Sequence, residues 1–399
     1  MARVLICWEL GNGLAYMEGL TAVARAISKA GHEVHFAVRD LGHAERLLGG
    51  RFPYYQAPTT VIPPNVSLQN PMTFADVLIN LGFGNPSAVT ARVRAWRHLL
   101  DFVKPDIVRC AHAPGALLAA RGTRIRSLVV GIGFLVPPSV SPLPVLRTWA
   151  KNPVPQRIAA REQQLLDGMN KGLDVIGAPK LANLGALYGE TDLRVLYTYP
   201  EMDDYGPRAD VKYLGNFQPG MGESPVWPEV KGKRIFAYLE PIKNIGLVLK
   251  ALAASGQPTL AYLPRPPEGL LQLQTTGNLR ITDKPLDLLK TAAACDIGLS
   301  LGGHNIVGTF LGAGKPQLMI PNYFPERVTS LKIAGLHAGL VASWDATDIS
   351  GRLTQLLTDA SFSEQSKVYA GRVAKFSMET AIKEAVTDID DLAALGPRR

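Results

Sequence analysis

The sequence predicts an α/β protein with two halves, each built around a parallel β-sheet covered by helices. Three observations predict this fold class. Short apolar segments of strand length alternate with segments of helical periodicity, and Gly-bearing turns often separate the two. The alternation is interrupted over residues 216–232 and then starts again. At 399 residues, the chain is long enough for two domains of ~100–200 residues each.

The first forty residues predict a complete strand–helix–strand unit. Residues 3–8 form a short apolar run, as expected of a strand that is covered on both faces. A Gly-bearing turn follows over residues 9–14, and apolar residues then recur at helical spacing up to Gly31, which we expect to end the helix. Residues 34–38 are the next strand, so the connection is a crossover between parallel strands.

The remaining elements follow from the same patterns. In the first half, we expect strands at 106–110, 127–131, 193–197 and 211–214, helices at 115–120 and 156–169, and long loops at 57–72 and 137–155. In the second half, we expect strands at 235–239, 259–263, 278–281, 297–300, 317–320 and 340–341, with helices at 242–254, 286–294, 305–313 and 326–334 and two more at the C-terminus.

These elements divide the chain into four parts. We expect an N-terminal Rossmann-like domain at 1–215, a linker rich in Gly, Pro and Ser at 216–232, and a C-terminal Rossmann-like domain at 233–375. The last helix, 376–399, is expected to pack back on the N-terminal domain. Ligands of such folds bind at the carboxyl ends of the strands, so two halves of this kind predict a cleft between the domains.

Composition excludes several classes of protein. Hydrophobic residues make up 47% of the chain and charged residues 19%, which argues against long disordered segments. Three well-separated cysteines, Cys7, Cys110 and Cys295, exclude a disulfide framework and a paired-cysteine metal site. No apolar run reaches the ~18 residues that cross a bilayer. The net charge of +8 favours anionic partners, but no long basic block indicates nucleic acid. We therefore expect a reduced, cytoplasmic protein that binds no nucleic acid.

The most informative segment starts where the predicted strand ends, at Ser300. Gly302 and Gly303 allow a tight turn and leave room for a ligand to approach the backbone. His304 and Asn305 then open a helix, whose unpaired N–H groups and partial positive charge suit a phosphate or diphosphate. The alternative is an ordinary Gly-rich turn in which Asn305 caps the helix.

The longer string favours the first interpretation, because it resembles the donor-binding signature of GT-B nucleotide-sugar glycosyltransferases. It is most similar to that of the UDP-glycosyltransferase family. The residues that carry this resemblance are Gly302, Gly303, His304, Asn305, Leu311, Gly314, Pro316 and Pro321. Weaker matches extend over most of the chain, at 8–13, 104–108, 131–138 and 210–215.

The resemblance implies a bacterial enzyme that transfers a sugar, with inversion and without a metal or other cofactor, from a UDP- or dTDP-sugar to a hydroxyl group. It places His304 beside the diphosphate and Glu240 and Pro241 in a second phosphate loop. By the same resemblance, further residues of the second half contact the donor. These are Ile281 near the base, Thr309 at the ribose position, and Glu326 or Arg327 at the sugar hydroxyls.

The catalytic base is the point at which the chain departs from the family pattern. The family has a Gly-His pair in its first Gly-rich loop (Gly11, Asn12 and Gly13 here), but this chain has Ala15 and Tyr16 at the pair's positions. Three explanations remain open. His112 is the base and Tyr16 positions the acceptor; Glu9, at the end of the first strand, is the base; or the chain binds nucleotide sugar without transferring it.

Other functions compete with this one. A catalytically silent partner of another glycosyltransferase would keep the donor site. An NAD-dependent oxidoreductase is suggested by Gly11 and Gly13 after a strand and by Arg39-Asp40 after the next one, but a third Gly is missing. A sugar-nucleotide epimerase would need a carboxylate cluster, which is not evident in the sequence.

The acceptor is expected to be a small or lipid-like molecule. The long loops at 57–72 and 137–155 carry aliphatic residues and Trp149, which suits an apolar acceptor. Basic residues such as Arg147, Lys151 and Arg157 follow, so peripheral contact with the inner membrane is a further expectation.

Overall fold

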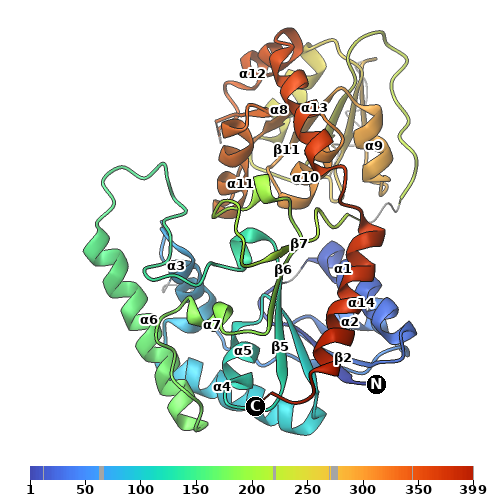
Figure 1. The fold of residues 1–399 in the computed structure, drawn as a ribbon. Coiled ribbons are helices and arrows are strands. Elements are labelled where there is room, and N and C mark those ends of the chain that lie inside the picture. Colours follow the sequence, from blue (N-terminus) through green and yellow to red (C-terminus); the bar gives the residue numbers. More distant parts are fainter. Residues whose placement is uncertain are drawn as a thin grey trace. The chain divides into compact units, whose positions relative to one another are not determined.

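The computed structural model describes residues 1–11, 13–62, 67–218, 222–268, 270, 277–343 and 345–398. The chain forms two compact units (Figure 1). Unit 1 contains residues 1–214 and 379–399, and unit 2 contains residues 215–378. Each unit has its own parallel sheet with helices on both faces.

The sheet of unit 1 has seven parallel strands in the order β3-β2-β1-β4-β5-β6-β7. Its strands are β1 (Arg3–Trp8), β2 (Glu33–Val38), β3 (Tyr54–Gln56), β4 (Ile107–Ala111), β5 (Arg126–Gly131), β6 (Leu193–Leu196) and β7 (Lys212–Tyr213). Its helices are α1 (Leu14–Lys29), α2 (Leu41–Leu48), α3 (Phe74–Leu78), α4 (Pro86–Val103), α5 (Pro114–Ala120), α6 (Pro155–Val175), α7 (Ala186–Gly189) and α14 (Met378–Ala394).

The sheet of unit 2 has six parallel strands in the order β10-β9-β8-β11-β12-β13. Its strands are β8 (Ile235–Tyr238), β9 (Thr259–Tyr262), β10 (Leu279–Thr282), β11 (Ile297–Ser300), β12 (Gln317–Met319) and β13 (Gly339–Val341). Its helices are α8 (Ile245–Ala254), α9 (Leu288–Ala294), α10 (His304–Gly312), α11 (Phe324–Gly335), α12 (Ile349–Thr358) and α13 (Ser361–Val373).

Both sheets have the strand order of a Rossmann fold. The first three strands are added toward one edge of the sheet, and the order then reverses, so that the fourth strand lies beside the first and later strands are added toward the other edge. In unit 1 the reversal lies between β1 and β4, and in unit 2 it lies between β8 and β11. Five of the six residues of β1 are buried, as are all those of β4 and β11, because helices cover both faces. Ligands of such sheets bind at the carboxyl ends of the strands that flank the reversal. The fold therefore identifies one candidate ligand-binding position in each unit.

The C-terminal helix α14 belongs to unit 1 (red in Figure 1). Lys212 of β7 forms ion pairs with Glu384 and Asp388, both at 2.6 Å, and His32 pairs with Asp390 at 2.8 Å. These contacts anchor the helix to the edge strand β7 and to the turn before β2, which both lie far from it in the sequence.

The structure differs from the sequence prediction at several places. No element was predicted for residues 73–103, where α3, a π-helical turn (Ile79–Phe83) and the long helix α4 lie, nor for β3. The segment 216–232, predicted as a linker, is part of unit 2 where it is described. It is tied to that unit because Glu223 N–H donates to the carbonyl of Pro285 at 2.8 Å, and Asp287 N–H donates to that of Glu223.

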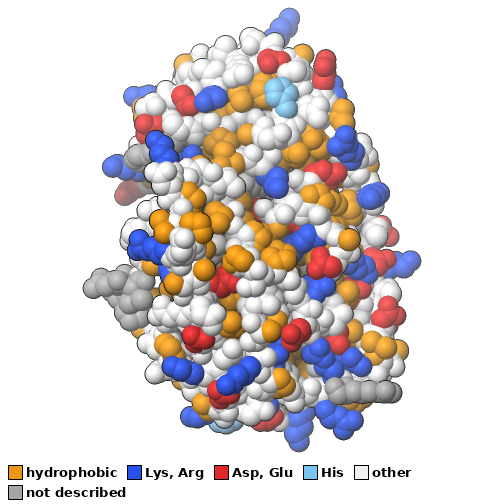
Figure 2. All heavy atoms as spheres, turned by 60° about the vertical axis from the view of Figure 1, so that its left-hand side comes forward, with side chains coloured by type: hydrophobic (Ala, Val, Ile, Leu, Met, Phe, Trp, Pro, Cys, Tyr) orange, Lys and Arg blue, Asp and Glu red, His pale blue; other side chains and the backbone are white. Residues whose placement is uncertain are grey.

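No described helix is both long enough and apolar enough to cross a membrane. Figure 2 shows hydrophobic side chains interspersed with Lys, Arg, Asp and Glu over the face that includes α6, rather than gathered in one band.

Candidate functional site

Glu9 lies at the carboxyl end of β1, at the reversal point of unit 1. Its side chain is fully buried, and Oε2 accepts a hydrogen bond of 2.7 Å from Gly115 N–H in the first turn of α5. Oε1 lies 3.5 Å from Arg92 Nε, and Arg92 is itself buried. A Cβ at Gly115 would lie 2.6 Å from Oε1, so this approach requires glycine. Glu9 thus ties the end of β1 to the turn that follows β4.

Burial raises the pKa of Glu9 to about 7, although the Arg92 charge, the amides of Gly115 and Ala116 and the Trp96 indole lower it. Loss of solvation outweighs these stabilising contacts because the carboxylate has no access to water. Glu9 therefore changes its charge close to neutral pH. It reaches no surface of the unit, so the geometry favours a supporting role over direct proton transfer from an acceptor.

His112 lies directly after β4, next to Glu9 in the fold. Its backbone has φ +48°, a left-handed conformation that is uncommon outside glycine and often marks a functional position. Leu10 N–H donates to its carbonyl at 3.2 Å, so the loop after β1 helps to hold this turn. Its ring lies 6.4 Å from that of Phe74. Nε2 is buried and has no hydrogen-bond partner within the described part of the chain.

Burial lowers the pKa of His112 to about 4. The imidazole is therefore neutral at pH 7, and a neutral imidazole has a nitrogen lone pair that can accept a proton. The neutral ring nitrogen without a partner among the described residues makes His112 a candidate proton acceptor at the reversal point of the sheet, although a pKa of about 4 makes it a weaker base than an exposed histidine.

Tyr16 lies in the first turn of α1, and its ring stacks on that of Trp8 with centroids 5.5 Å apart. Burial raises its pKa to about 12, although the nearby Arg109 charge lowers it. The phenol therefore stays protonated at neutral pH, which fits contact with an acceptor better than proton abstraction. Gly11 packs against Trp8, because a Cβ there would overlap the indole, and Gly13 is the N-cap of α1. Asn12 lies outside the described residues.

Two tyrosines at this edge of unit 1 were not predicted. The hydroxyls of Tyr188 in α7 and Tyr205 after β6 are buried, and neither finds a hydrogen-bond partner in the described ranges. Burial raises both pKa values, so both phenols stay protonated. Tyr188 also packs edge-on against Phe74, which places it near His112. No motif surrounds either tyrosine, so the sequence carries no signal for them.

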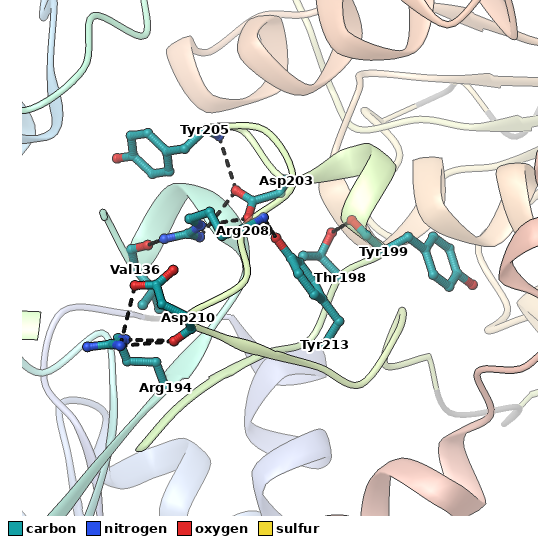
Figure 3. Close-up of polar contacts among 9 residues, drawn as sticks. All are labelled: Val136, Arg194, Thr198, Tyr199, Asp203, Tyr205, Arg208, Asp210 and Tyr213. Atoms are coloured by element: carbon teal, nitrogen blue, oxygen red, sulfur yellow. Dashed lines mark hydrogen bonds and ion pairs between the residues drawn. The ribbon is translucent and has the colours of Figure 1, made fainter. Parts of the chain in front are cut away.

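The loop after β6 is held by Asp203, which is fully buried (Figure 3). Its carboxylate accepts two hydrogen bonds from Arg208, at 2.9 and 3.2 Å, and one from the Tyr213 hydroxyl at 2.6 Å. Arg208 also donates to the carbonyl of Val136 at 2.8 Å. Asp203 Oδ1 accepts from Tyr205 N–H, so this network fixes the backbone of the unpredicted Tyr205.

The predicted phosphate-binding turn lies at the reversal point of unit 2. β11 ends at Ser300, whose hydroxyl accepts from Gly302 N–H at 3.2 Å. Gly302 has φ +87°, which glycine adopts without strain. Gly303 is the N-cap of α10, and the first turn of this helix has neither a side-chain cap nor an acidic residue. The N–H groups of this turn are therefore free to bind an anion.

His304 opens α10 and is 9% exposed. Neither of its ring nitrogens has a hydrogen-bond partner among the residues described, and the same holds for the nearby Ser330 hydroxyl. Burial lowers the pKa of His304 to about 4, so its ring is neutral at pH 7 and offers one donor and one acceptor. Unpaired polar groups therefore collect at this helix end.

Thr309 does not present its hydroxyl as a free group. The hydroxyl donates to the carbonyl of Asn305 at 2.7 Å and accepts from Asn216 Nδ2 at 3.1 Å. Asn216 was not predicted as a site residue, and it lies in the segment 216–232 that was predicted as a linker.

The other predicted donor residues lie at the carboxyl ends of strands or in the segment after β12. Glu240 and Pro241 follow β8 and are exposed, whereas the Ile281 side chain is buried in the core of unit 2. Glu326 uses Oε2 to accept from the N–H groups of Asn322 and Tyr323, both at 2.9 Å. Burial raises the pKa of Glu326, the amides lower it, and the Glu240 charge adds to the rise.

Arg327 follows Glu326 in α11 and is half-buried. Within unit 1, the fold thus brings Glu9 and His112 together, with Tyr16 beside the same strand end. Within unit 2, it brings Gly302, Gly303 and His304 together. No group of three or more His, Cys, Asp or Glu side chains in the described ranges could hold a metal ion.

The sequence matches no model of a known protein family and no curated protein. The structure, however, is similar to solved glycosyltransferase structures over nearly the whole chain. The spinosyn rhamnosyltransferase SpnG is 15% identical, with a TM-score of 0.64 over 97% of this chain and 100% of that one. The glycosyltransferase VinC in complex with DTDP is 14% identical, with a TM-score of 0.64 and the same coverage.

A third structure, the glycosyltransferase SsfS6 of Streptomyces sp. SF2575 complexed with thymidine diphosphate, is 18% identical. Its TM-score is 0.62, over 98% of this chain and 100% of that one. At these identities the likeness concerns the fold alone. It confirms the predicted α/β fold class, and we conclude that the chain has the GT-B fold with two Rossmann-like domains.

Proposed function

We propose that the protein is a glycosyltransferase that moves a sugar from a nucleoside diphosphate to a hydroxyl group of an acceptor. The observation that carries this proposal is the uncapped N-terminus of α10, with Gly302 and Gly303 before it and with His304, which has no partner among the described residues, beside it. Two of the similar structures are described as complexes with DTDP or thymidine diphosphate, which supports a UDP- or dTDP-sugar as donor.

In the proposed reaction, the acceptor oxygen attacks the anomeric carbon from the face opposite the diphosphate, so the configuration inverts. The bond between that carbon and the phosphate oxygen breaks, and the diphosphate leaves with the electron pair. The acceptor proton passes to Nε2 of His112, which is neutral and without a partner in the described structure. The N–H groups at Gly303, His304 and Asn305 stabilise the charge on the leaving diphosphate, and no metal ion is needed for this.

Glu9 supports this reaction without taking the proton. It anchors the first turn of α5 through Gly115, three residues after His112, and so stabilises the left-handed turn at His112. Tyr16, with its raised pKa, would donate a hydrogen bond to the acceptor.

A cavity in unit 1 supports an amphiphilic acceptor. A cavity of about 330 Å³ in unit 1 is lined by residues of both long loops and of α6, including the apolar Met72 and Ile158 and the basic Lys151, Arg157 and Arg161. We propose that the acceptor is a small or lipid-like molecule and that unit 1 contacts an acidic membrane surface peripherally. Vesicles that contain anionic lipid should carry the protein upward in a flotation gradient, and neutral vesicles should not.

The function is tested by incubating the full chain with a panel of UDP- and dTDP-sugars and hydroxyl-bearing acceptors. We expect sugar transfer, or donor hydrolysis when acceptor is absent, that is lost in His112→Ala. Calorimetry on the same variant should show unchanged nucleotide affinity. Binding of nucleotide sugar without any turnover would instead support a catalytically silent partner of another glycosyltransferase. This is the second candidate, because the hydrogen bond from Gly115 anchors Glu9 and removes it as an alternative base.

A further inference from the structure

Asn216 lies just after β7, at the start of unit 2, and its side chain is seated against α10. Nδ2 donates to the carbonyl of Asn305 at 2.9 Å and to Thr309 Oγ1 at 3.1 Å. A Cβ at Gly308 would lie 2.7 Å from Asn216 Cγ, so the helix has a glycine where the amide packs. The Asn216 side chain thus packs against Asn305, Gly308 and Thr309, which lie on one face of α10.

The orientation of the Asn216 amide follows from these contacts. The Thr309 hydroxyl gives its only proton to the carbonyl of Asn305, at 2.7 Å, so its oxygen can only accept from Asn216. The carbonyl of Asn305 can also only accept. Both neighbours therefore require the NH₂ group of the amide, and the carbonyl oxygen Oδ1 must point away from them.

Asn216 Oδ1 is buried and has no hydrogen-bond partner among the described residues. A buried acceptor without a partner is unfavourable because it has lost its hydrogen bonds to water, so such an atom calls for a missing donor. Phosphate oxygens at neutral pH accept hydrogen bonds but do not donate them, so they cannot be the partner of Oδ1. A partner for Oδ1 must therefore be a hydroxyl or N–H group, while the free N–H groups at 303–305 suit the phosphates.

We propose that Asn216 Oδ1 accepts a hydrogen bond from a pentose hydroxyl of the nucleoside diphosphate bound at the N-terminus of α10. This inference rests on the proposed function. Asn305 and Thr309 are four residues apart, a rise of ~6 Å along the helix, which is comparable to the reach from a diphosphate to the hydroxyls of its own pentose. Asn216 is then the ribose-recognising residue, and Thr309 is a positioning residue that acts through it.

The test is calorimetric titration of the full chain with UDP, 2′-deoxy-UDP and 2′,3′-dideoxy-UDP. For the wild type, we expect removal of the contacted hydroxyl to weaken binding ~3- to 10-fold, the size of one neutral hydrogen bond. Asn216→Ala should bind all three nucleotides about as weakly as the wild type binds the dideoxy form. The exposed Gln355→Ala on α12 serves as a control that keeps the discrimination.

A matched pair at the positioning residue keeps the test informative if Asn216→Ala folds poorly. Thr309→Ser retains the hydroxyl that orients the amide and should preserve the discrimination between the nucleotides. Thr309→Val removes that hydroxyl at nearly constant volume and should reduce it. If Asn216→Ala weakens UDP and dideoxy-UDP equally, or leaves the discrimination intact, the inference is wrong while the proposed function stands. If the wild type binds dTDP but none of the three, the same comparison is made between dTDP and 3′-deoxy-dTDP. If it binds neither the three nucleotides nor dTDP, the proposed function fails as well.

Discussion

Gly302→Ala is expected to destabilise unit 2, whereas Gly303→Ala is expected to be tolerated. Gly302 has φ +87°, and an L-residue in the left-handed region costs ~1–2 kcal/mol. Its new Cβ would also overlap Ser330 Oγ and lie 3.0 Å from the carbonyl oxygen of Glu326, which adds ~1 kcal/mol or more. Gly303 has φ −61°, and a Cβ there meets only Ile306 Cγ2 at 3.9 Å.

The sum for Gly302→Ala is roughly 2–4 kcal/mol, which lowers the Tm of a unit of this size by roughly 4–16 °C. Gly303→Ala should change the Tm by less than ~2 °C. Thermal unfolding of the full chain measures both. Adding Ser330→Ala to Gly302→Ala removes the overlap but not the backbone strain, so it should recover only part of the loss. Equal Tm values for the wild type and Gly302→Ala would refute the assigned turn geometry.

Three further predictions concern both units. Gly115→Ala places a Cβ 2.6 Å from Glu9 Oε1 and should lower stability by ~1–3 kcal/mol, measured by thermal unfolding; an unchanged Tm would contradict the Glu9 anchor. The raised pKa of Glu9 favours the protonated folded state, so this residue's contribution to stability should fall as the pH rises from about 4.5 to about 7. The Tm difference between the wild type and Glu9→Gln should show that fall, and a difference independent of pH would contradict it. The pKa of His304 is lowered rather than raised, so the pH dependence is reversed. The contribution of His304 to the stability of the folded state should be lost as the pH falls from about 6.5 to about 4. His304→Ala should remove this acid sensitivity and also weaken UDP binding in calorimetry; an unchanged acid sensitivity would argue against a buried neutral ring.

Much of the fold could be predicted because buried parallel strands and Gly-bearing turns leave local patterns. The apolar run of β1 and the Gly302-Gly303 turn after β11 are both visible within ten residues of sequence. α4 was not predicted, although Val89, Val93, Trp96 and Leu100 are buried in it at helical spacing.

The site could be predicted only in part, since its decisive contacts join residues that are distant in sequence. Glu9 and Gly115 meet because β1 and β4 are neighbours in the sheet, which the chain order does not state. Thr309 was assigned a ligand contact by resemblance, yet Asn216 from another segment occupies its hydroxyl. Resemblance identified the helix, but only the packing shows which atoms on it remain unpaired.

The most direct test of the account is a crystal structure of the full chain with UDP or dTDP. The account predicts diphosphate oxygens within hydrogen-bond distance, ~3 Å, of the main-chain nitrogens of Gly303, His304 and Asn305. A diphosphate bound instead at the loop after β1, or a protein side chain capping α10 in the complex, would contradict it.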